Sequence, residues 1–376
     1  MIFTTVTIAD IHFGAIPANK LYDELKSTFI KYIKNHHVDM VVIAGDFYNS
    51  LMSLNSPSAL SATQIISDII ESAKENNIRY IRIIEGTLSH DNFQIKQFSI
   101  FEKIDGIDFK IITEITTEVI EGMKFLFIPE EYGKSMNEYK YFLDVPKKYY
   151  DMIFGHGMFK ETSFESDDEN RISTSVIWDS KLLASICKGP VIFGHIHTSQ
   201  IIRKNIYYCG SFSRWSYGQE EPKGFYIFIY EPKSHKYLYD FIENKKADKY
   251  DTIIFNLDNF PDDIDVKYFI TKSLETIKDN LRIQIIIGDP EKDYTFKLNF
   301  LKEYFTGKPK FKLQIIDKRS IKMQEEATLE LQKTNTEYNY IFDKNVSLKT
   351  KISKYIRKEY NEEISEDIIK DLLDIN

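Results

Sequence analysis

Cysteine is scarce in this chain of 376 residues, which carries only Cys187 and Cys209. Two thiols cannot form a disulfide framework, and their scarcity favours a reducing compartment. An uninterrupted apolar run of the ~18 residues that a membrane-spanning helix requires is also missing. The N-terminus enters a strand-like run without the basic flank of a signal peptide. The sequence therefore predicts a cytoplasmic protein without a membrane partner.

An excess of positive charge is missing as well. The 49 lysines and arginines are outnumbered by 57 aspartates and glutamates, which leaves a net charge of −8. This balance argues against a protein coated in basic surface for nucleic acid. It is still compatible with a local basic groove, because affinity for phosphates depends on where the cations lie. Bound divalent metal would offset part of the acidity.

Apolar residues, by contrast, are abundant, and residues 1–232 alternate between expected strands and helices. Several of the strands are apolar along most of their length, which is typical of strands buried on both faces. We therefore predict an α/β (α+β) fold class, a two-sheet sandwich flanked by helices. Strands are expected at 2–9, 40–44, 80–84, 110–113, 118–120, 124–128, 150–154, 190–193, 206–209 and 224–230, with 110–128 forming a hairpin meander that turns at Glu121-Gly122.

The pattern breaks around 231–234, and two further regions follow. Residues 233–320 read as a small α+β capping domain, with strands at 252–257, 282–287 and 310–317 and helices at 265–278 and 299–305. Its lysines Lys308, Lys310 and Lys312 either contact a DNA backbone or are ordinary solvated side chains. Residues 321–376 read as a linker and short amphipathic helices, which either dock on the body or bind a partner.

Histidine and aspartate recur at the ends of the strand-like runs of the first region. Residues i and i+2 of a strand point the same way, so two side chains of one segment can converge on one point. Carboxylate and imidazole donors without thiolate suit Mn²⁺, Fe²⁺ or Zn²⁺, and six of them suit two metals that share a carboxylate. The segments are Asp10-Ile11-His12, Gly45-Asp46, Gly86-Thr87-Leu88-Ser89-His90-Asp91, Gly155-His156 and Gly194-His195-Ile196-His197.

In this order the segments resemble the five motifs of the calcineurin-like metallophosphoesterases. The run Gly210-Ser211-Phe212-Ser213-Arg214-Trp215-Ser216-Tyr217-Gly218 is similar to the segment after the last motif in SbcD-type double-strand-break repair nucleases. The specific motifs cover most of 1–232, and beyond that the resemblance is one of layout. The form of the third motif suggests a phage-encoded or otherwise divergent branch, which would place the protein in a host cytoplasm.

The resemblance implies roles for these residues and a cofactor of two divalent metal ions, Mn²⁺ by family. His90 would contact the scissile phosphate and protonate or stabilise the leaving oxygen, and Asp91 would orient His90. The metal ligands would be Asp10, His12 and His197 for one ion, His156 and His195 for the other, and Asp46 as the bridge.

Two departures from the family pattern affect the site. The third motif lacks the Asn that ligates the second metal, and Ser89, directly before the histidine, could offer a hydroxyl there or simply cap a turn. Asn49 stands where such nucleases commonly carry a histidine, and it could donate a hydrogen bond to phosphate. Arg214 is a further candidate for a phosphate contact, although an aromatic-rich loop of this kind is more often core.

These observations predict a Mn²⁺-dependent DNA exo- and endonuclease that hydrolyses phosphodiesters at a two-metal site. By resemblance it would be the nuclease subunit of an SbcCD-like repair or recombination complex. It would form a homodimer, act on double-stranded ends, and bind an SbcC-type ABC ATPase with a coiled coil through the helices after Asn345. The alternatives are a metallophosphoesterase with a small substrate, such as a nucleotide or phosphoprotein phosphatase, and an assembly scaffold whose site has decayed.

Overall fold

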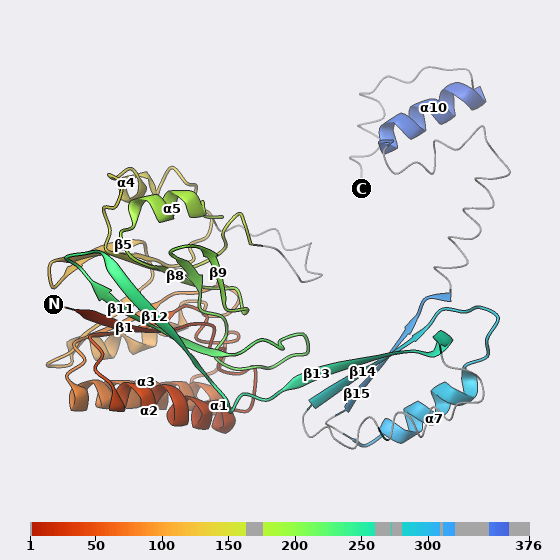
Figure 1. Cartoon of the computed structure of the whole chain (residues 1–376), viewed down its shortest axis with the longest axis horizontal. Helices are drawn as coiled ribbons and strands as arrows, with labels where there is room; N and C mark the ends of the chain where they lie inside the picture. The colour runs from red at the N-terminus through yellow and green to blue at the C-terminus, as the bar shows by residue number, and fades with distance from the viewer. Residues whose placement is uncertain are drawn as a thin grey trace. The chain divides into compact units, whose positions relative to one another are not determined.

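The structure is a computed structural model that describes residues 2–162, 176–259, 272, 280–308, 311–319 and 346–360. The chain divides into two compact units, Met1–Asp251 and Thr252–Asn376. The first contains two six-stranded sheets and the second contains a three-stranded sheet. The predicted fold class is confirmed for the first unit, which is a two-sheet α/β sandwich flanked by helices (Figure 1).

The first sheet has the strand order β12-β11-β1-β2-β3-β4. Strands β1 to β4 run parallel to one another, whereas β11 is antiparallel to both β1 and β12. The strands are β1 (Phe3–Ile8), β2 (Met40–Ala44), β3 (Tyr80–Ile84), β4 (Asp108–Ile112), β11 (Gly224–Glu231) and β12 (Lys236–Glu243).

The second sheet has the order β5-β6-β7-β8-β10-β9. Its four inner strands are parallel, and the two edge strands β5 and β9 are antiparallel to their neighbours. The strands are β5 (Thr116–Ile120), β6 (Met123–Ile128), β7 (Met152–His156), β8 (Val191–Gly194), β9 (Gln200–Arg203) and β10 (Ile206–Tyr208).

Alternate residues of the central strands belong to different cores. On β2, Val41 and Ile43 pack against helices on the outer face of the first sheet. Met40, Val42 and Ala44 belong instead to the core shared with the second sheet. Both faces of β2 are therefore buried, which is why its sequence is apolar throughout rather than alternating. A third core covers the outer face of the second sheet.

Helices cover the two outer faces of the sandwich (Figure 1). The longest, α3 (Pro57–Asn76), begins where the Ser56 hydroxyl accepts a hydrogen bond from the Ala59 amide, and it ends at Asn77 in the left-handed conformation. These are ordinary start and stop signals of a helix. The others are α1 (Ala18–Leu25), η1 (Lys26–Ile30), α2 (Lys31–Asn35), η2 (Gln94–Lys103), α4 (Lys140–Leu143) and α5 (Ser180–Ile186).

The structure corrects the expected meander and the first domain boundary. Strand β4 pairs with β3 in the first sheet, while β5 and β6 form a hairpin in the second, so the chain crosses between sheets. The turn at Glu121-Gly122 is as predicted, and both residues have positive φ. The first unit extends through Asp251 rather than ending at 232, because β12 pairs along its whole length with β11.

The second unit is built on the sheet β13-β14-β15, which encloses its own small core with α7. The strands expected at 252–257, 282–287 and 310–317 are present, and the helix expected at 265–278 lies outside the described residues. Among the described residues, no helix is both long enough and apolar enough to cross a membrane. The elements are β13 (Tyr250–Asn256), η3 (Leu257–Asn259), β14 (Asn280–Ile287), α7 (Thr295–Phe305), β15 (Phe311–Asp317) and α10 (Leu348–Tyr360).

Candidate metal centre

Parallel strands from both sheets end at a common site. The residues that follow β1, β2 and β3 come from the first sheet, and those that end or follow β6, β7 and β8 come from the second. The carboxyl ends of parallel strands are where open α/β folds bind ligands. The structure brings together six of the side chains singled out in the sequence, which are Asp10, His12, Asp46, His156, His195 and His197.

The first cluster consists of Asp10, His12 and His197, whose potential ligand atoms lie within 4.8 Å of one another. Nε2 of His12 is 3.2 Å from Nε2 of His197. Trp215 packs against both rings, with centroids 4.6 Å from that of His12 and 4.9 Å from that of His197. The carboxylate of Asp10 accepts the His195 amide at 3.0 Å and so connects the two sheets.

The second cluster consists of Asp46, His156 and His195, again within 4.8 Å. One carboxylate oxygen of Asp46, Oδ1, lies 3.3 Å from Nε2 of His156. The other, Oδ2, lies 3.7 Å from Nε2 of His12 in the first cluster. Asp46 therefore reaches both clusters, and the motif resemblance implies a bridging ligand at this residue.

The backbone is strained where it presents these side chains. Asp10, His12, Asp46 and His195 have φ values of 49°, 53°, 49° and 97°. Residues other than glycine adopt such values at an energetic cost, and these conformations cluster at functional sites. The strain indicates that the fold holds the four side chains in place against the local preference of the chain.

Gly45 permits the close approach of the two sheets at the site, and Gly86 permits the close approach of the loops after β2 and β3. A Cβ atom on Gly45, which has a φ of +81°, would lie 2.1 Å from Nδ1 of His156. A Cβ atom on Gly86 would lie 2.1 Å from the amide nitrogen of Asp46. Neither contact is compatible with a side chain, so each glycine is required for the neighbouring ligand candidate to keep its position.

Burial and neighbouring charge separate the histidines into two kinds. Burial lowers the pKa of His12 well below its usual value and that of His197 to about 4. Both imidazoles are therefore neutral at pH 7 and offer lone pairs. Burial also acts to lower the pKa of His156, but the carboxylates of Asp46, Asp10 and Glu130 together outweigh burial and raise that pKa well above the usual value.

The geometry around His156 tests whether a cation fits. Its Nδ1 lies 2.8 Å from the Ala44 carbonyl oxygen, which can only accept, so Nδ1 carries the hydrogen and Nε2 faces Asp46. A bare lone pair against a carboxylate is repulsive, so the position requires a cation, either a proton or a metal ion. In addition, Nδ1 of His12 is buried without a hydrogen-bond partner among the described residues. With carboxylate and imidazole donors only, the residues present fit divalent Mn, Fe or Zn.

Two residues beside the second cluster were missed by the sequence reasoning. Glu130, which follows β6, places Oε2 3.1 Å from Nδ1 of His195 and 3.6 Å from Nε2 of His156. The Thr87 hydroxyl lies 3.2 Å from Asp46 Oδ2 and 3.2 Å from Glu130 Oε2. Glu130 carries the same signal as Asp46, a carboxylate directly after an apolar strand, and Thr87 directly follows Gly86.

The hydroxyl beside the second cluster is that of Thr87, and not that of Ser89 as the sequence suggested. Ser89 is exposed in the turn that follows, whereas Thr87 reaches the imidazoles of His156 and His195, each at 3.4 Å. The physical reason is that the extra residues of this motif lengthen the turn after Thr87. Counting backwards from His90 therefore selects the wrong position.

His90 lies beside both clusters but is oriented differently from the prediction. Its ring centroid is 4.6 Å from that of His12, and it groups with His12 and Asp46. Its Nδ1 is 2.6 Å from the backbone oxygen of Asn49, so the main chain of Asn49, rather than Asp91, orients the ring. Asp91 is fully buried and accepts the amides of Tyr48 and Gly86, each at 2.9 Å. It joins the loops after β2 and β3.

Arg214 does not reach the site, which corrects the predicted phosphate contact. Its guanidinium is buried and donates to backbone oxygens, with Nε 2.8 Å from Gln219 O and Nη2 2.5 Å from Glu221 O. It therefore fixes the loop that carries Trp215. Lys223 acts in the same region, because its buried Nζ donates to the His197 carbonyl oxygen at 2.8 Å.

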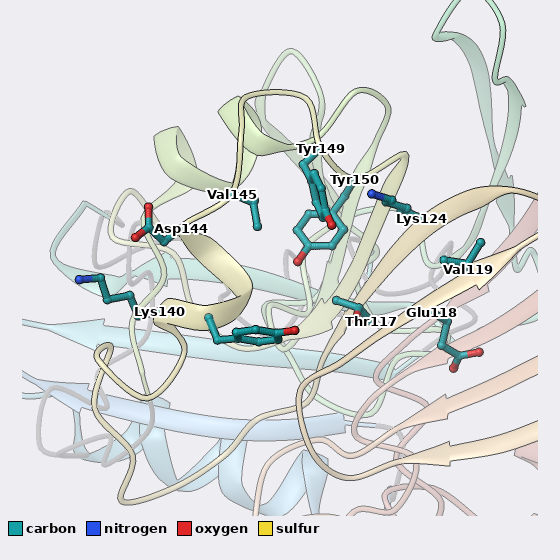
Figure 2. Close-up of a pocket in the computed structure, with 10 residues that line it drawn as sticks. Thr117, Glu118, Val119, Lys124, Lys140, Asp144, Val145, Tyr149 and Tyr150 are labelled. Atoms are coloured by element: carbon teal, nitrogen blue, oxygen red, sulfur yellow. The ribbon is translucent and has the colours of Figure 1, made fainter.

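A cavity of about 630 Å³ lies away from the clusters, beside the edge strand β5 (Figure 2). Val119 and Tyr141 at this cavity are 69 % and 84 % exposed, and Lys124 Nζ lies 3.8 Å from the centroid of the Tyr149 ring. The clustered histidines do not line it, so its size does not make it the reactive site. A smaller cavity of about 350 Å³ instead adjoins the second cluster through Gly86 and Glu130.

Comparison with models of known protein families gives no match, and neither does comparison with curated proteins. Among solved structures, the chain is similar to one described as a novel archaeal phosphodiesterase. The two share 14 % identity with a TM-score of 0.32, over 64 % of this chain and 100 % of that chain. A TM-score this low gives the likeness no weight for the activity of this chain.

Proposed function

We propose that this chain is a metal-dependent phosphodiesterase that hydrolyses DNA. The observation that carries the proposal is the pair of donor clusters on either side of Asp46, with His90 beside both. The motif resemblance supports the same assignment, since its five segments end the strands that meet here. Six donors converge from segments far apart in the chain, which a purely structural role would not require.

The first cluster would hold one divalent cation and the second the other, with Asp46 between them and Glu130 and Thr87 as added donors to the second. Two such ions, Mn²⁺ by resemblance, would polarise a phosphoryl oxygen and would activate water as the nucleophile. His90 can act on the leaving oxygen. Its Nδ1–H donates to Asn49 O, so Nε2 is the nitrogen that gains and loses a proton.

The protein's own contribution is to position these groups and exclude water from them. The rings of His12 and His197 are held under Trp215, and His197 is also tied through its carbonyl oxygen to Lys223. Asp91 fixes the loop that carries His90 by accepting amides from the loops after β2 and β3. Such fixed geometry lowers the entropic cost of bringing phosphate and donors together.

The finer parts of the proposal concern the complex in which the enzyme works. The family resemblance suggests a homodimer and an SbcC-type ABC ATPase as partner, bound through the region that contains α10. That helix carries several lysines and one arginine along an amphipathic stretch, which is compatible with a partner-binding helix. Lys308, which precedes β15, and Lys312, which lies in β15, are candidates in the second unit for contacts to a DNA backbone.

The test is an assay with Mn²⁺ in which linear duplex and single-stranded DNA are compared with para-nitrophenyl phosphate and cyclic nucleotides. We expect cleavage of DNA, loss of cleavage with EDTA, and a decrease of roughly a hundredfold or more in kcat for His90→Ala. His37→Ala, which removes an exposed histidine 74 % accessible at its side chain, is the matched control and should cleave normally. Turnover of the small esters alone would identify a small-substrate phosphatase, and no turnover with metal bound would identify a scaffold.

A further inference from the structure

The cavity of about 350 Å³ beside the second cluster has features of a binding site. It is formed by the residues after β3, β4 and β6. Gly86 and Glu130 belong to its wall and also to the surroundings of Asp46 and His195. If a phosphate is held at the clusters, the group esterified to that phosphate would therefore lie beside this cavity. Its volume is within the range of small-ligand pockets.

The rim of the cavity carries an aromatic ring in a strained position. Phe93 is 48 % exposed and has a φ of 59°, directly after Asn92 with a φ of 43°. The Glu85 carboxylate accepts the Phe93 amide at 2.5 Å and holds the residue there. Lys96 Nζ lies 4.7 Å from the centroid of the ring. The exposure of a large apolar ring and the strain of its backbone both destabilise the folded protein. Their occurrence together indicates that the exposed face of the ring has a function.

The wall of the cavity carries an unsatisfied acceptor. Glu85 is 2 % exposed, and its second carboxylate oxygen, Oε2, has no hydrogen-bond partner among the described residues. A buried polar atom without a partner costs free energy that a donor from a ligand would recover. Tyr132 completes the wall, where its hydroxyl donates to Glu130 Oε1 at 2.9 Å and accepts the Leu88 amide at 3.1 Å. That pair connects the cavity wall to the second cluster.

We infer that this cavity binds the base of the nucleotide whose phosphate reaches the clusters, an inference that rests on the proposed phosphodiesterase activity. An aromatic face and a carboxylate acceptor together fit a planar heterocycle with an N–H donor, such as the exocyclic amino group of adenine or cytosine. Phe93 would stack on the base and Glu85 Oε2 would accept its amino hydrogen. A base can enter only when it is unpaired, so the preferred substrate is single-stranded or has a frayed end.

Binding measured without divalent metal separates this inference from the activity. In EDTA, we expect the full-length protein to bind dAMP roughly tenfold more tightly than deoxyribose 5-phosphate, as judged by titration calorimetry. Phe93→Ala should abolish that difference. Phe93 is exposed, so its replacement is compatible with folding. Tyr141→Ala, which removes a still more exposed ring at the other cavity, is the control and should keep the difference. Equal affinity for the two ligands, or a difference that survives Phe93→Ala, would overturn the inference.

Hydrolysis with Mn²⁺ gives an independent readout. The ratio of kcat/KM for the para-nitrophenyl ester of dAMP to that for bis(para-nitrophenyl) phosphate should fall roughly tenfold in Phe93→Ala. A preference for the nucleotide in binding without any hydrolysis would retain the base site and refute the proposed function. Hydrolysis of both esters with an unchanged ratio would retain the proposed function and refute the base site.

Discussion

Asp46 is the residue through which the two donor clusters meet. Its two carboxylate oxygens approach His156 of one cluster and His12 of the other, at 3.3 and 3.7 Å. Its carboxylate also accepts the Thr87 amide at 2.6 Å. The negative charges of Asp10, Asp46 and Glu130 lie within a site that excludes water, where a cation is stabilised strongly. The charge of Asp46 should therefore matter more than its shape.

Replacement of Asp46 by Asn removes that charge while keeping the size of the side chain. We expect the affinity for Mn²⁺ to fall by at least roughly a hundredfold, because even supporting residues around metal ligands commonly account for ten- to a hundredfold. Titration calorimetry with Mn²⁺ measures the effect. Asp68→Asn, at a buried carboxylate that instead accepts the Tyr22 hydroxyl at 2.8 Å, is the control. Unchanged Mn²⁺ binding in Asp46→Asn would show that Asp46 does not bridge two metal ions.

Thr87 and Ser89 give a sharp comparison between two hydroxyls of one turn. Thr87→Val keeps the shape of the side chain and loses the oxygen near Asp46 and Glu130. The affinity of the second cluster for Mn²⁺ should therefore fall roughly tenfold. Ser89→Ala changes an exposed side chain and should have no effect. Metal content of the dialysed proteins, measured by mass spectrometry, distinguishes them. The opposite order of effects would restore Ser89 as the ligand.

At the scale of elements, the fold depends on a buried ion pair between the two sheets. Arg82 on β3 has a side chain that is 0 % exposed, and Glu118 on β5 is 9 % exposed. The guanidinium donates to both carboxylate oxygens of Glu118, at 3.0 and 2.7 Å, and to Asp108 Oδ2 at 2.8 Å. These bonds connect the two sheets at the place where the chain passes from one sheet to the other.

Glu118→Gln should lower the free energy of unfolding by about 3 kcal/mol, because it leaves a buried guanidinium with less compensating charge. Chemical denaturation followed by circular dichroism measures this change. The control is Glu75→Gln, which breaks a surface pair with Lys34 whose side chains are 51 % and 38 % exposed and should cost less than about 1 kcal/mol. Equal effects of the two substitutions would show that the inter-sheet pair stabilises the fold no more than a surface pair does.

Two strands at the edges of the sheets were not predicted, for a reason visible in their sequences. In β12 every second side chain, those of Tyr237, Tyr239 and Phe241, packs on aromatic rings of β10 and β11, although Tyr239 is still 47 % exposed. The signal was therefore a period of two and not a continuous apolar run. β9 is only four residues long and half-buried, which is too short for any periodicity to show.

At the scale of the whole molecule, the donor clusters belong entirely to the first unit. Among the residues that the structure describes, its three cores contain none beyond Ile242, whereas the core of the second unit consists only of residues after Asp251. The segment after β12 is also tied back into the first unit, where Asn244 donates to Glu24 Oε2 at 2.8 Å and to Phe212 O at 3.1 Å.

A fragment of residues 1–251 should therefore fold and bind Mn²⁺ with nearly the affinity of the full chain. Circular dichroism, thermal unfolding and calorimetry test this expectation. Ending the fragment at 232 removes β12 and Asn244, exposes Phe228 and Tyr226, and should give an insoluble or unfolded product. A stable fragment of 1–232 would show that β12 is not required.

The sequence by itself determined the residue types at the ends of the buried strands. Strands that are apolar throughout must lie inside, and a polar residue directly after them must lie at the edge of a sheet. The fold class and the grouping of His12, Asp46, His156 and His197 could therefore be predicted from local pattern. The position of a side chain could be predicted in the same way where it depends only on the direction of a strand and on a neighbouring glycine.

The tertiary structure alone decided which groups touch. Thr87 rather than Ser89 faces the second cluster, Asn49 O rather than Asp91 orients His90, and Arg214 binds backbone oxygens of its own loop. These choices depend on turn geometry and on the distance between two sheets packed through a shared core. Neither is encoded in the spacing of residues along one segment, because hydrogen bonds and packing act between atoms that are close in space and distant in the chain.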